Sequence, residues 1–301
     1  MRAACALLVV AAGCTEQLDD GAPWQPVEEM TGALAPEVGP APAASAPAGC
    51  TLRVASWNVH FGADPDGLAR AIAGSTEVAR ADVLFVQEIE AYPAEAGSRA
   101  ARLAAALGMT WVYAPARVEG DGTHGIATLS RFPITAAAVR ELPYFDQPLR
   151  PRERNALAVT VDAGAQPLQL VNVHLDVRLG PVDRIRQLDP AATDLDERAV
   201  LGGDFNSNPY AWAGSLVPLA ETEAILGQDQ ARVLDDYIIA RRFTSSISPE
   251  VTTMRVPIIG MRIDNLYARA LPITASGIEY VDGSDHWPVW TDVALCAAAA
   301  Y

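Results

Sequence analysis

The sequence contains no lysine, so arginine supplies all 22 basic residues, and the 37 acidic residues give a net charge of −15. A surface that coats nucleic acid is therefore not expected. Any anionic substrate would need positive charge supplied locally, by arginine or by a metal ion. Half of the 301 residues are hydrophobic, which is enough for one or two domains with a buried core.

Several catalytic fingerprints are missing as well. The Walker motif of P-loop nucleotide enzymes, the G-x-S-x-G nucleophile turn of esterases and the H-E-x-x-H zinc pair do not occur. No cysteine lies near His174 or His286, and no internal repeat is visible. These absences leave P-loop, serine-esterase and zinc-peptidase chemistry without their usual residues.

The N-terminal residues are typical of an export signal. Met1 and Arg2 precede an apolar stretch, residues 3–12, that is too short for the ~20 residues of a membrane-spanning helix. The residues that end at Cys14 resemble the lipobox of bacterial lipoproteins, in which small residues precede a lipidated cysteine. We therefore expect residues 1–14 to direct export. The protein would lie in the bacterial cell envelope as a lipoprotein or, without the modification, be periplasmic or secreted.

Residues 15–49 contain six prolines and six acids but no base. This composition cannot bury a core, so we predict a disordered Pro/Ala/Glu-rich tether. In an exported protein the two remaining cysteines, Cys50 and Cys296, can form a disulfide. They flank the first and the last predicted strand, and we predict a bridge if those strands are antiparallel neighbours.

From Cys50 onward, short apolar runs alternate with turn residues and a few alanine-rich stretches. Helices are expected from Asp64-Pro65, around 95–107, over 183–188 and near 211–225. Strands are expected over 52–59, 83–87, 111–114, 125–130, 134–140, 156–161, 168–174, 199–202, 263–268 and 287–295. This order favours an α/β fold, a four-layer α/β sandwich in which two mainly antiparallel sheets pack face to face with helices outside. We expect residues 50–301 to form this single domain as a monomer.

Polar residues that suit metal ions and phosphate end five of these apolar strands, and a sixth segment, residues 262–266, places Asp264 inside an otherwise apolar strand. The six segments are 56–59, 85–88, 171–175, 201–206, 262–266 and 283–288. Taken singly, each of these polar residues could cap a turn or be satisfied within a core. Together they indicate groups that satisfy one another or a cation, because burying an unpaired acid is costly. Carboxylate and amide oxygens without cysteine favour a hard cation, Mg²⁺ first, with Mn²⁺ or Ca²⁺ as alternatives.

The residues in and around these segments resemble the motifs of the endonuclease/exonuclease/phosphatase superfamily. In order, they read SWNVH, VQEIE, NVHL, GGDFNSNP, RIDNL and SDHWPV, and the match covers residues 50–296. The resemblance implies Mg²⁺-dependent hydrolysis of phosphoesters on a four-layer α/β sandwich. It also implies that residues 50–301 are the catalytic domain.

The resemblance implies three residues on the metal side. Glu88 would be the main metal ligand, Asn58 would help to hold the metal or its water, and Asp285 would be a further acid. Arg154 could clamp a phosphate in substrate binding, although a solvated basic turn is the simpler interpretation. His124 stands at a family position without a settled role.

Five catalytic residues are implied in the same way. His286 would be the base that activates water, and Asp264 would orient its ring. Asp204 and Asn206 would position the nucleophile and the phosphate oxygens. His174 would hydrogen-bond the phosphate or the leaving group. In-line attack places negative charge on the phosphate oxygens, so a cation and an imidazolium placed there lower the barrier.

The sequence does not identify the substrate. It could be extracellular nucleic acid or a phospholipid headgroup, as in sphingomyelinases, and a noncatalytic binding module that kept the fold is a third possibility. Family members usually carry a longer helix where residues 183–188 stand, and their DNA-gripping Lys/Arg insertions are not evident in this sequence. These departures argue against duplex DNA more than against hydrolysis.

Overall fold

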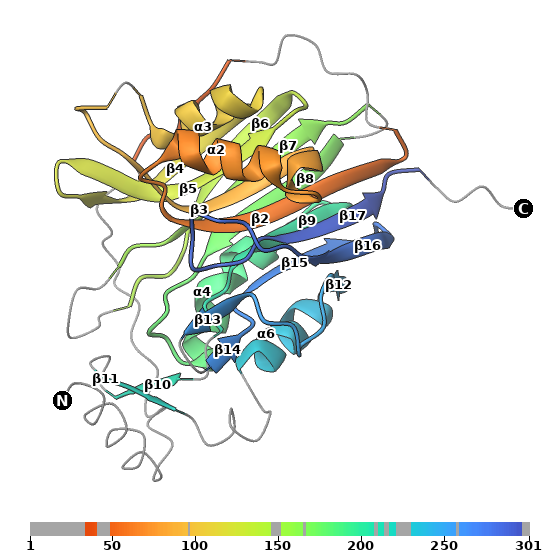
Figure 1. Ribbon diagram of the computed structural model, residues 1–301. Coiled ribbons are helices and arrows are strands. Elements are labelled where there is room, and N and C mark those ends of the chain that lie inside the picture. The colour runs from red at the N-terminus through yellow and green to blue at the C-terminus, as the bar shows by residue number, and fades with distance from the viewer. Residues whose placement is uncertain are drawn as a thin grey trace, which may run out of the picture.

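The computed structural model describes residues 34–40, 49–95, 97–145, 152–164, 167–207, 210–213, 217–220, 230–256 and 259–296. Two β-sheets pack face to face and helices cover their outer faces, which confirms the four-layer α/β sandwich (Figure 1). The predicted export signal, residues 1–14 with Cys14, lies outside the described residues. Within the described ranges, no helix is long and apolar enough to cross a membrane.

The first sheet has seven strands in the order β1-β4-β5-β3-β2-β17-β16. They are β1 (Glu37–Val38), β2 (Thr51–Phe61), β3 (Val83–Ala91), β4 (Thr110–Glu119), β5 (Gly122–Ser130), β16 (Ile273–Ile278) and β17 (Val289–Ala294). Strands β2 and β3 are parallel, and the other neighbouring pairs are antiparallel. Helices α2 (Pro65–Gly74) and α3 (Arg99–Leu107), with the short 3-10 helix η1 (Val78–Arg80), lie on the outer side (Figure 1).

Local signals set the ends of α2 and α3. The Asp64 carboxylate accepts a hydrogen bond from the backbone N–H of Gly67 at 2.9 Å, and Pro65 suits the first turn. Ser98 caps α3 in the same way, and Gly108 ends it in the left-handed conformation at φ +66°. The apolar faces of both helices belong to one buried cluster with β2 and β3, which fixes them on this sheet.

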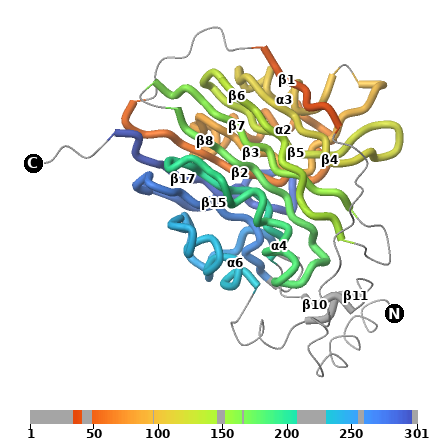
Figure 2. The backbone as a smooth tube through the Cα atoms, turned by 180° about the vertical axis from the view of Figure 1, so that it is seen from behind, coloured from red at the N-terminus to blue at the C-terminus, as the bar shows by residue number. Residues whose placement is uncertain are grey.

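The second sheet has six strands in the order β12-β15-β9-β8-β7-β6. They are β6 (Ile134–Glu141), β7 (Asn155–Asp162), β8 (Pro167–His174), β9 (Ala199–Asp204), β12 (Phe243–Ser245) and β15 (Asp264–Arg269). Strands β8 and β9 are parallel and the rest are antiparallel. Helices α4 (Pro181–Ala192) and α6 (Gln230–Ile239) pack on its outer side, as Figure 2 shows from behind.

The side chains that face the space between the sheets change from apolar to polar along three strands. The rows are Leu52, Val54, Ser56 and Asn58 in β2; Leu168, Leu170, Asn172 and His174 in β8; and Val200, Gly202 and Asp204 in β9. Because alternate residues of a strand share one face, each row begins in the inter-sheet core and ends in a polar group. The sandwich therefore becomes polar inside at one edge.

A pair of buried amides joins the sheets beneath that edge. The Gln87 Nε2 donates to Asn172 Oδ1 at 2.7 Å, and Asn172 Nδ2 donates to the carbonyl oxygen of Ala127 at 2.8 Å. Gln87 and Ala127 belong to the first sheet and Asn172 to the second. These hydrogen bonds fix how the two sheets are aligned under the polar edge.

The predicted disulfide is confirmed, since Cys50 and Cys296 are bonded. The strands they flank, β2 and β17, are antiparallel neighbours, and Thr51 lies opposite Ala294 in their register. The backbone N–H of Leu295 also donates to the carbonyl oxygen of Cys50 at 2.8 Å. The bridge thus joins the start of β2 to the end of β17.

Two predictions about elements are wrong. The helix expected near 211–225 is replaced, in its described part, by a hairpin of β10 (Tyr210–Ala213) and β11 (Val217–Ala220). Pro218 disfavours a helix interior there and is tolerated on a short edge strand. A second hairpin pairs β13 (Met254–Val256) with β14 (Ile259–Met261).

The other wrong prediction concerns Glu37–Val38. These residues, expected in a disordered tether, instead pair with β4 as the edge strand β1.

Helix α4 is also longer than the brief segment expected before Asp189-Pro190. It continues past Pro190 to Ala192, although proline removes one hydrogen bond from the last turn. The guanidinium of Arg140 donates to the carbonyl oxygens of Pro190 at 2.9 Å and of Thr193 at 2.8 Å. These contacts satisfy carbonyl groups that the helix end leaves free, so the helix persists.

Candidate active site

The predicted site residues come from both sheets, and all of them except Asp285 meet at the polar edge between the sheets. The first sheet contributes Asn58 from the end of β2, Glu88 from β3, and Asp285 and His286 from the segment before β17. The second sheet contributes Arg154 from just before β7, His174 from β8, Asp204 and Asn206 from β9 and the residues after it, and Asp264 from β15. The site exists because the sheets are stacked in this alignment.

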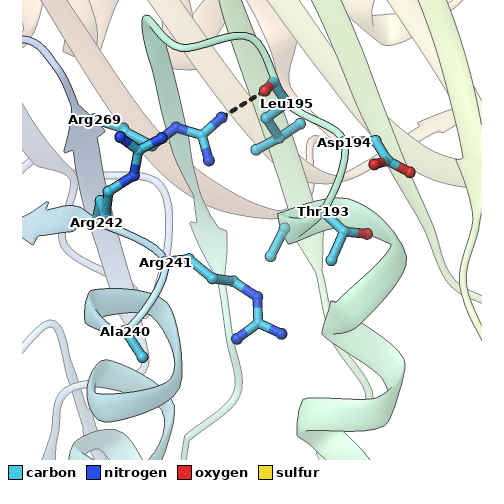
Figure 3. Close-up of a pocket in the computed structure, with 8 residues that line it drawn as sticks. Thr193, Asp194, Leu195, Ala240, Arg241, Arg242 and Arg269 are labelled. Atoms are coloured by element: carbon cyan, nitrogen blue, oxygen red, sulfur yellow. Dashed lines mark hydrogen bonds between the residues drawn. The ribbon is translucent and has the colours of Figure 1, made fainter.

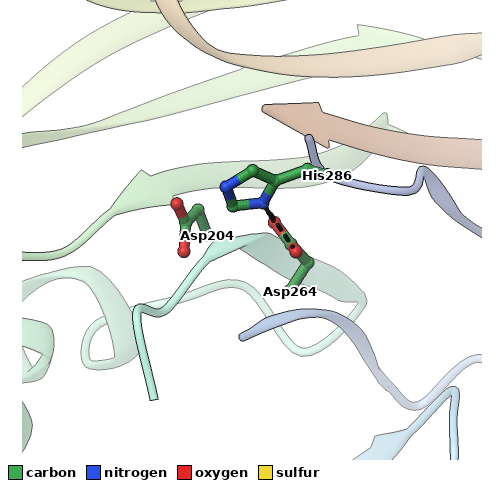
Figure 4. Close-up of side chains that lie close together, drawn as sticks. All are labelled: Asp204, Asp264 and His286. Carbon is green, nitrogen blue, oxygen red and sulfur yellow. Dashed lines mark hydrogen bonds and ion pairs between the residues drawn. The ribbon is translucent and has the colours of Figure 1, made fainter. Parts of the chain in front are cut away.

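His286 and Asp264 form a buried hydrogen-bonded pair (Figure 4). Nδ1 of His286 lies 2.9 Å from Oδ2 and 3.1 Å from Oδ1 of Asp264. An ionised carboxylate can only accept, so Nδ1 is the protonated nitrogen and the orientation of the ring is fixed. Burial alone would disfavour the charged imidazole, but the Asp264 charge outweighs it and raises the pKa of His286 to about 10.

Asp204 is the centre of the buried cluster. Its Oδ2 accepts a hydrogen bond from Asn58 Nδ2 at 2.9 Å, and its Oδ1 accepts one from the backbone N–H of Asn206 at 2.8 Å. Burial and then the neighbouring charge of Asp264 raise the pKa of Asp204 to about 7. A buried carboxylate whose pKa is raised by a second carboxylate beside it marks a suitable place for a cation.

Backbone geometry at the end of β9 aims these residues. Gly203 has a φ of +140°, and a Cβ there would meet the carbonyl oxygen of Val173 at 2.0 Å. Only glycine therefore allows β9 to approach β8 so closely beside Asp204. Asn206 then takes a left-handed φ of +49°, and its Nδ2 donates to the carbonyl oxygen of Leu175 at 2.9 Å. The Asn206 side chain is thereby held at the end of β8.

Glu88 reaches the site through a β-bulge in β3. The register with β5 pairs Gln87 with Ile126 and Ile89 with Gly125, which leaves Glu88 as the extra residue. It has a left-handed φ of +55°. Bulges re-aim a side chain in this way next to active sites. The Glu88 Oε1 lies 3.7 Å from His174 Nε2, and its side chain is 19% exposed, so it lies at the mouth of the cluster.

His174 lies between the carboxylates and Arg154. Its Nε2 is 3.5 Å from Asp204 Oδ2, and the Arg154 Nη1 is 2.8 Å from its Nδ1 and 3.1 Å from its Nε2. Burial and then the Arg154 charge hold the pKa of His174 well below its usual range. Arginine can only donate, so a neutral His174 accepts at Nδ1 and carries its proton on Nε2, which faces the carboxylates.

Arg154 is not a solvated basic turn, because the structure buries its side chain. Burial lowers the pKa of Arg154 to about 10, although the negative charge of buried Asp176 acts to raise it. The guanidinium therefore stays charged at neutral pH behind His174.

Asp285, by contrast, does not belong to the buried cluster. Its side chain is 45% exposed, and its Oδ1 lies 3.5 Å from Nδ1 of His60.

The donor set fits a divalent cation. Asp204, Asp264 and His286 each offer one ligand atom, and these atoms lie within 4.8 Å of one another. Glu88 and the amide of Asn58 stand at the same junction, and such oxygen-rich sets suit hard cations. A divalent ion at this junction would also explain how the chain tolerates so many buried acids.

A pocket of about 560 Å³ lies elsewhere, at the far end of β15 (Figure 3). Three arginines, Arg241, Arg242 and Arg269, line it. Asp264 begins β15 and Arg269 ends it, so the pocket lies roughly 17 Å along the strand from the cluster, at ~3.3 Å per residue. The carboxylate cluster, rather than this pocket, is the candidate active site.

One group beside the site was missed by the sequence analysis. Glu90 Oε2 accepts hydrogen bonds from Arg99 Nη1 at 2.8 Å and from Tyr92 Oη at 3.1 Å. Glu90 Oε1 lies 3.5 Å from Nδ1 of buried His124, whose ring centroid is 6.3 Å from that of His174. The available signal was the second acid of the VQEIE motif, which follows Glu88 by two residues on the same bulged strand.

Comparisons with known proteins agree with this geometry. The model of the Endonuclease/Exonuclease/phosphatase family matches residues 55–286. A family structure from Beutenbergia cavernae DSM 12333 is similar with a TM-score of 0.63 at 23% identity, covering 81% of this chain and 72% of that one. One from Leptotrichia buccalis C-1013-b has a TM-score of 0.61 at 16% identity, covering 80% and 99%.

A third similar structure is D. rerio TDP2 complexed with a single strand DNA product. Its TM-score is 0.55 at 19% identity, covering 81% of this chain and 98% of that one. Identities this low show a shared fold, and a comparison with curated proteins finds no match. The family model, in contrast, spans most of the chain, from β2 to His286. The chain therefore belongs to the endonuclease/exonuclease/phosphatase family.

Proposed function

We propose that this protein hydrolyses phosphoesters with a divalent cation, Mg²⁺ first, held by the carboxylate cluster. The observation that carries the proposal is the buried Asp264–His286 pair within reach of Asp204. Membership of the family supports a hydrolase of the nuclease or phosphatase type. Glu88, Asn58 and Asp204 are the residues that would hold the cation, which would supply positive charge to the phosphate oxygens.

In this proposal His286 takes the proton of the attacking water. Without a cation, burial is outweighed by the charges of Asp264 and Asp204, which raise the pKa of His286 to about 10, so the ring is protonated; a divalent cation in the cluster would lower that pKa and leave the ring neutral. Because Nδ1 donates to Asp264, Nε2 is then the nitrogen that accepts the proton, and Asp264 stabilises the imidazolium that results. Asp204 and Asn206, joined by the 2.8 Å hydrogen bond, would orient the water and the phosphate. The side chains are already fixed by the fold, so little reorganisation is needed during the reaction.

His174 acts on the other side of the phosphorus in the same proposal. Its neutral ring presents the Nε2 proton to the junction of Asp204 and Glu88, where a phosphate oxygen or leaving group can accept it. The buried charge of Arg154 behind the ring favours the negative charge that develops there. Arg154 would thus act on the substrate through His174 rather than contact the phosphate directly.

The test is a substrate panel. The protein would be incubated with bis-p-nitrophenyl phosphate, plasmid DNA or sphingomyelin, each with Mg²⁺, Mn²⁺, Ca²⁺ or EDTA. We expect turnover of at least one phosphoester that EDTA abolishes, and the panel assigns the diesterase, nuclease or lipase type. Absence of EDTA-sensitive turnover across the panel would favour a noncatalytic binding module. The single strand DNA product bound by the similar D. rerio TDP2 favours a nucleic acid over sphingomyelin as the first choice.

We also propose that the protein is exported and anchored by lipid on Cys14. The apolar stretch over residues 3–12 and the small residues before Cys14 support this. The Cys50–Cys296 disulfide supports an oxidising compartment. Detergent phase partitioning of the protein expressed in a bacterium tests it: the wild type should enter the detergent phase and Cys14→Ser should not. Equal partitioning of both would reject the anchor.

A further inference from the structure

The chain takes an unusual path where β2 ends beside the cluster. His60, Phe61 and Gly62 have φ angles of +46°, +70° and +61°, so three consecutive residues are left-handed. For the first two, the Cβ makes this conformation unfavourable. Such a path persists only where surrounding contacts enforce it, and functional sites are where it is found.

Three hydrogen bonds enforce this path. The Asn58 Oδ1 accepts from the backbone N–H of His60 at 3.1 Å, and the Arg99 Nη1 donates to the carbonyl oxygen of Phe61 at 2.9 Å. The backbone N–H of Gly62 donates to the carbonyl oxygen of Val59 at 3.1 Å. Asn58 also holds Asp204 through its Nδ2, so the segment is fixed relative to the cluster.

The segment presents an aromatic ring at the rim of the site. Phe61 is 41% exposed on a segment that these hydrogen bonds hold in place. Its ring centroid lies 4.6 Å from that of His60 and 6.2 Å from that of His124, and the His124 centroid lies 6.3 Å from that of His174. A line of rings therefore runs from solvent to a residue of the buried cluster.

We propose that Phe61, with His60 beside it, is a stacking platform for a planar aromatic group that neighbours the scissile phosphate, such as a nucleobase. This rests on the proposed function, and it makes Phe61 a specificity-determining residue. Aromatic side chains bind bases through their faces with little sequence preference, so an exposed ring such as that of Phe61 can stack with a base of any kind. Local recognition of one base also suits a chain of net charge −15, which cannot grip a long polyanion.

Insertion of Phe61 into a lipid surface fits the surroundings less well. The His60 side chain is 57% exposed and Asp285, 3.5 Å from it, is 45% exposed. Burying the Phe61 ring in lipid would also take this pair out of water, and the desolvation cost of such a pair can exceed its mutual attraction. A base that stacks on the ring leaves both groups in water.

The test measures binding without turnover. Fluorescence anisotropy in EDTA would compare a short oligothymidylate with an abasic phosphodiester oligomer of the same length. We expect the wild type to bind the base-bearing oligomer about tenfold more tightly, which is the order of stacking of one base on an aromatic ring. Phe61→Leu should lose that ratio, and Phe61→Trp, which keeps a flat ring, should retain it. Val182→Ala, an exposed apolar residue on α4, is the matched control and should keep the ratio.

The outcomes separate the two proposals. Equal binding of both oligomers by the wild type, or an unchanged ratio in Phe61→Leu with a normal melting temperature, overturns the platform. If Phe61→Leu instead weakens binding to phosphatidylcholine–sphingomyelin vesicles while the base preference persists, the ring serves a lipid surface and the platform is wrong. A base preference without EDTA-sensitive hydrolysis would leave the platform standing and overturn the proposed function.

Discussion

Nδ1 of His286, in the segment that leads into β17 of the first sheet, lies 2.9 Å from Oδ2 of Asp264, which begins β15 of the second sheet. Asn58 and Asp204 are joined across the same boundary at 2.9 Å. The candidate site is thus a product of sheet stacking, because neither sheet alone carries a complete pair. Loss of the alignment between the sheets would separate the base from the acid that orients it.

Removing the imidazole of His286 should abolish most activity while leaving the fold intact. We expect His286→Ala to lose at least ~100-fold in rate, because a positioned base contributes about that much or more. Asp264→Asn should show a comparable loss, since the amide oxygen can still accept from Nδ1 but no longer carries the charge that stabilises the imidazolium. Steady-state kinetics and circular dichroism provide the measurements, with Asp236→Asn on the exposed face of α6 as the control. Near-wild-type turnover in His286→Ala would contradict its assignment as the base.

Cation binding should stabilise the folded chain. A ligand at about 100 times its Kd adds about 2.7 kcal/mol to the free energy of unfolding. We therefore expect Mg²⁺ to raise the melting temperature and EDTA to reverse the effect. Glu88→Gln should reduce the response, because it removes a charged oxygen at the mouth of the cluster. An equal Mg²⁺ response in Glu88→Gln and the wild type would exclude Glu88 as a ligand.

A methyl group at Gly203 should be poorly tolerated. The Cβ of Gly203→Ala would meet backbone atoms of Val173, and the φ of +140° is itself unfavourable for alanine. We expect a loss of about 3 kcal/mol in the free energy of unfolding and reduced activity, since Asp204 is displaced. Gly74→Ala is the control. A Cβ added at Gly74, the last residue of α2, would meet no neighbouring atom within 4 Å, so this substitution should change the free energy of unfolding by less than ~1 kcal/mol. Urea denaturation compares the two, and equal effects would refute the steric argument.

Loss of the disulfide should weaken the fold but not the chemistry. The bridge joins residues 246 positions apart, so its removal frees a long loop in the unfolded chain. We expect Cys50→Ser with Cys296→Ser to lower the free energy of unfolding by about 2–5 kcal/mol, with kcat retained at low temperature. Intact-mass analysis after alkylation provides the direct check. If both thiols react before reduction, the bridge is absent from the protein.

Asp176 should make the stability depend on pH under acid conditions. Burial would raise its pKa, but the charges of Arg154 and Arg178 outweigh that and lower it below 3.8. A depressed folded-state pKa stabilises the protein above pH 3.8, and the contribution is lost as the pH falls through the folded value. Asp176→Asn should therefore cost about 3 kcal/mol at pH 7, because Arg178, 3.3 Å away, loses its charged partner and Arg154 loses the negative charge that opposes its desolvation. Urea titrations should show the difference shrinking below pH 4, and a difference that stays constant with pH would contradict an ionic origin.

Most of the residues that form the site could be found from the sequence because they stand where an apolar strand ends or begins. Alternation along β2, β8 and β9 keeps Asn58, His174 and Asp204 in the same rows as core residues, so the pattern that predicts the strands also predicts which way these groups point. Their partners could not be deduced from pattern alone. The contact of Asp264 with His286 depends on how the two sheets stack, and no local signal carries that information.

The other structural features that the sequence did not predict also depend on contacts between segments distant in the chain. The bulge that aims Glu88 and the left-handed path at Phe61 are enforced by neighbouring strands and by Arg99, which is distant in sequence. The length of α4 depends on Arg140, which caps it from β6. Propensity alone predicted a helix near 211–225, where the described residues form a hairpin. Tertiary contacts override local preference in each case.

The hydrogen bond between the amides of Gln87 and Asn172 limits how this scaffold can vary. Replacing both by valine and leucine would keep the interior filled, yet it would permit one layer to slip past the other by a residue. Such a slip, roughly 3.3 Å along the strands, would move the acids of one layer out of hydrogen-bonding reach of the histidines of the other. Engineering for new substrates should therefore begin at the rim and leave this polar link untouched.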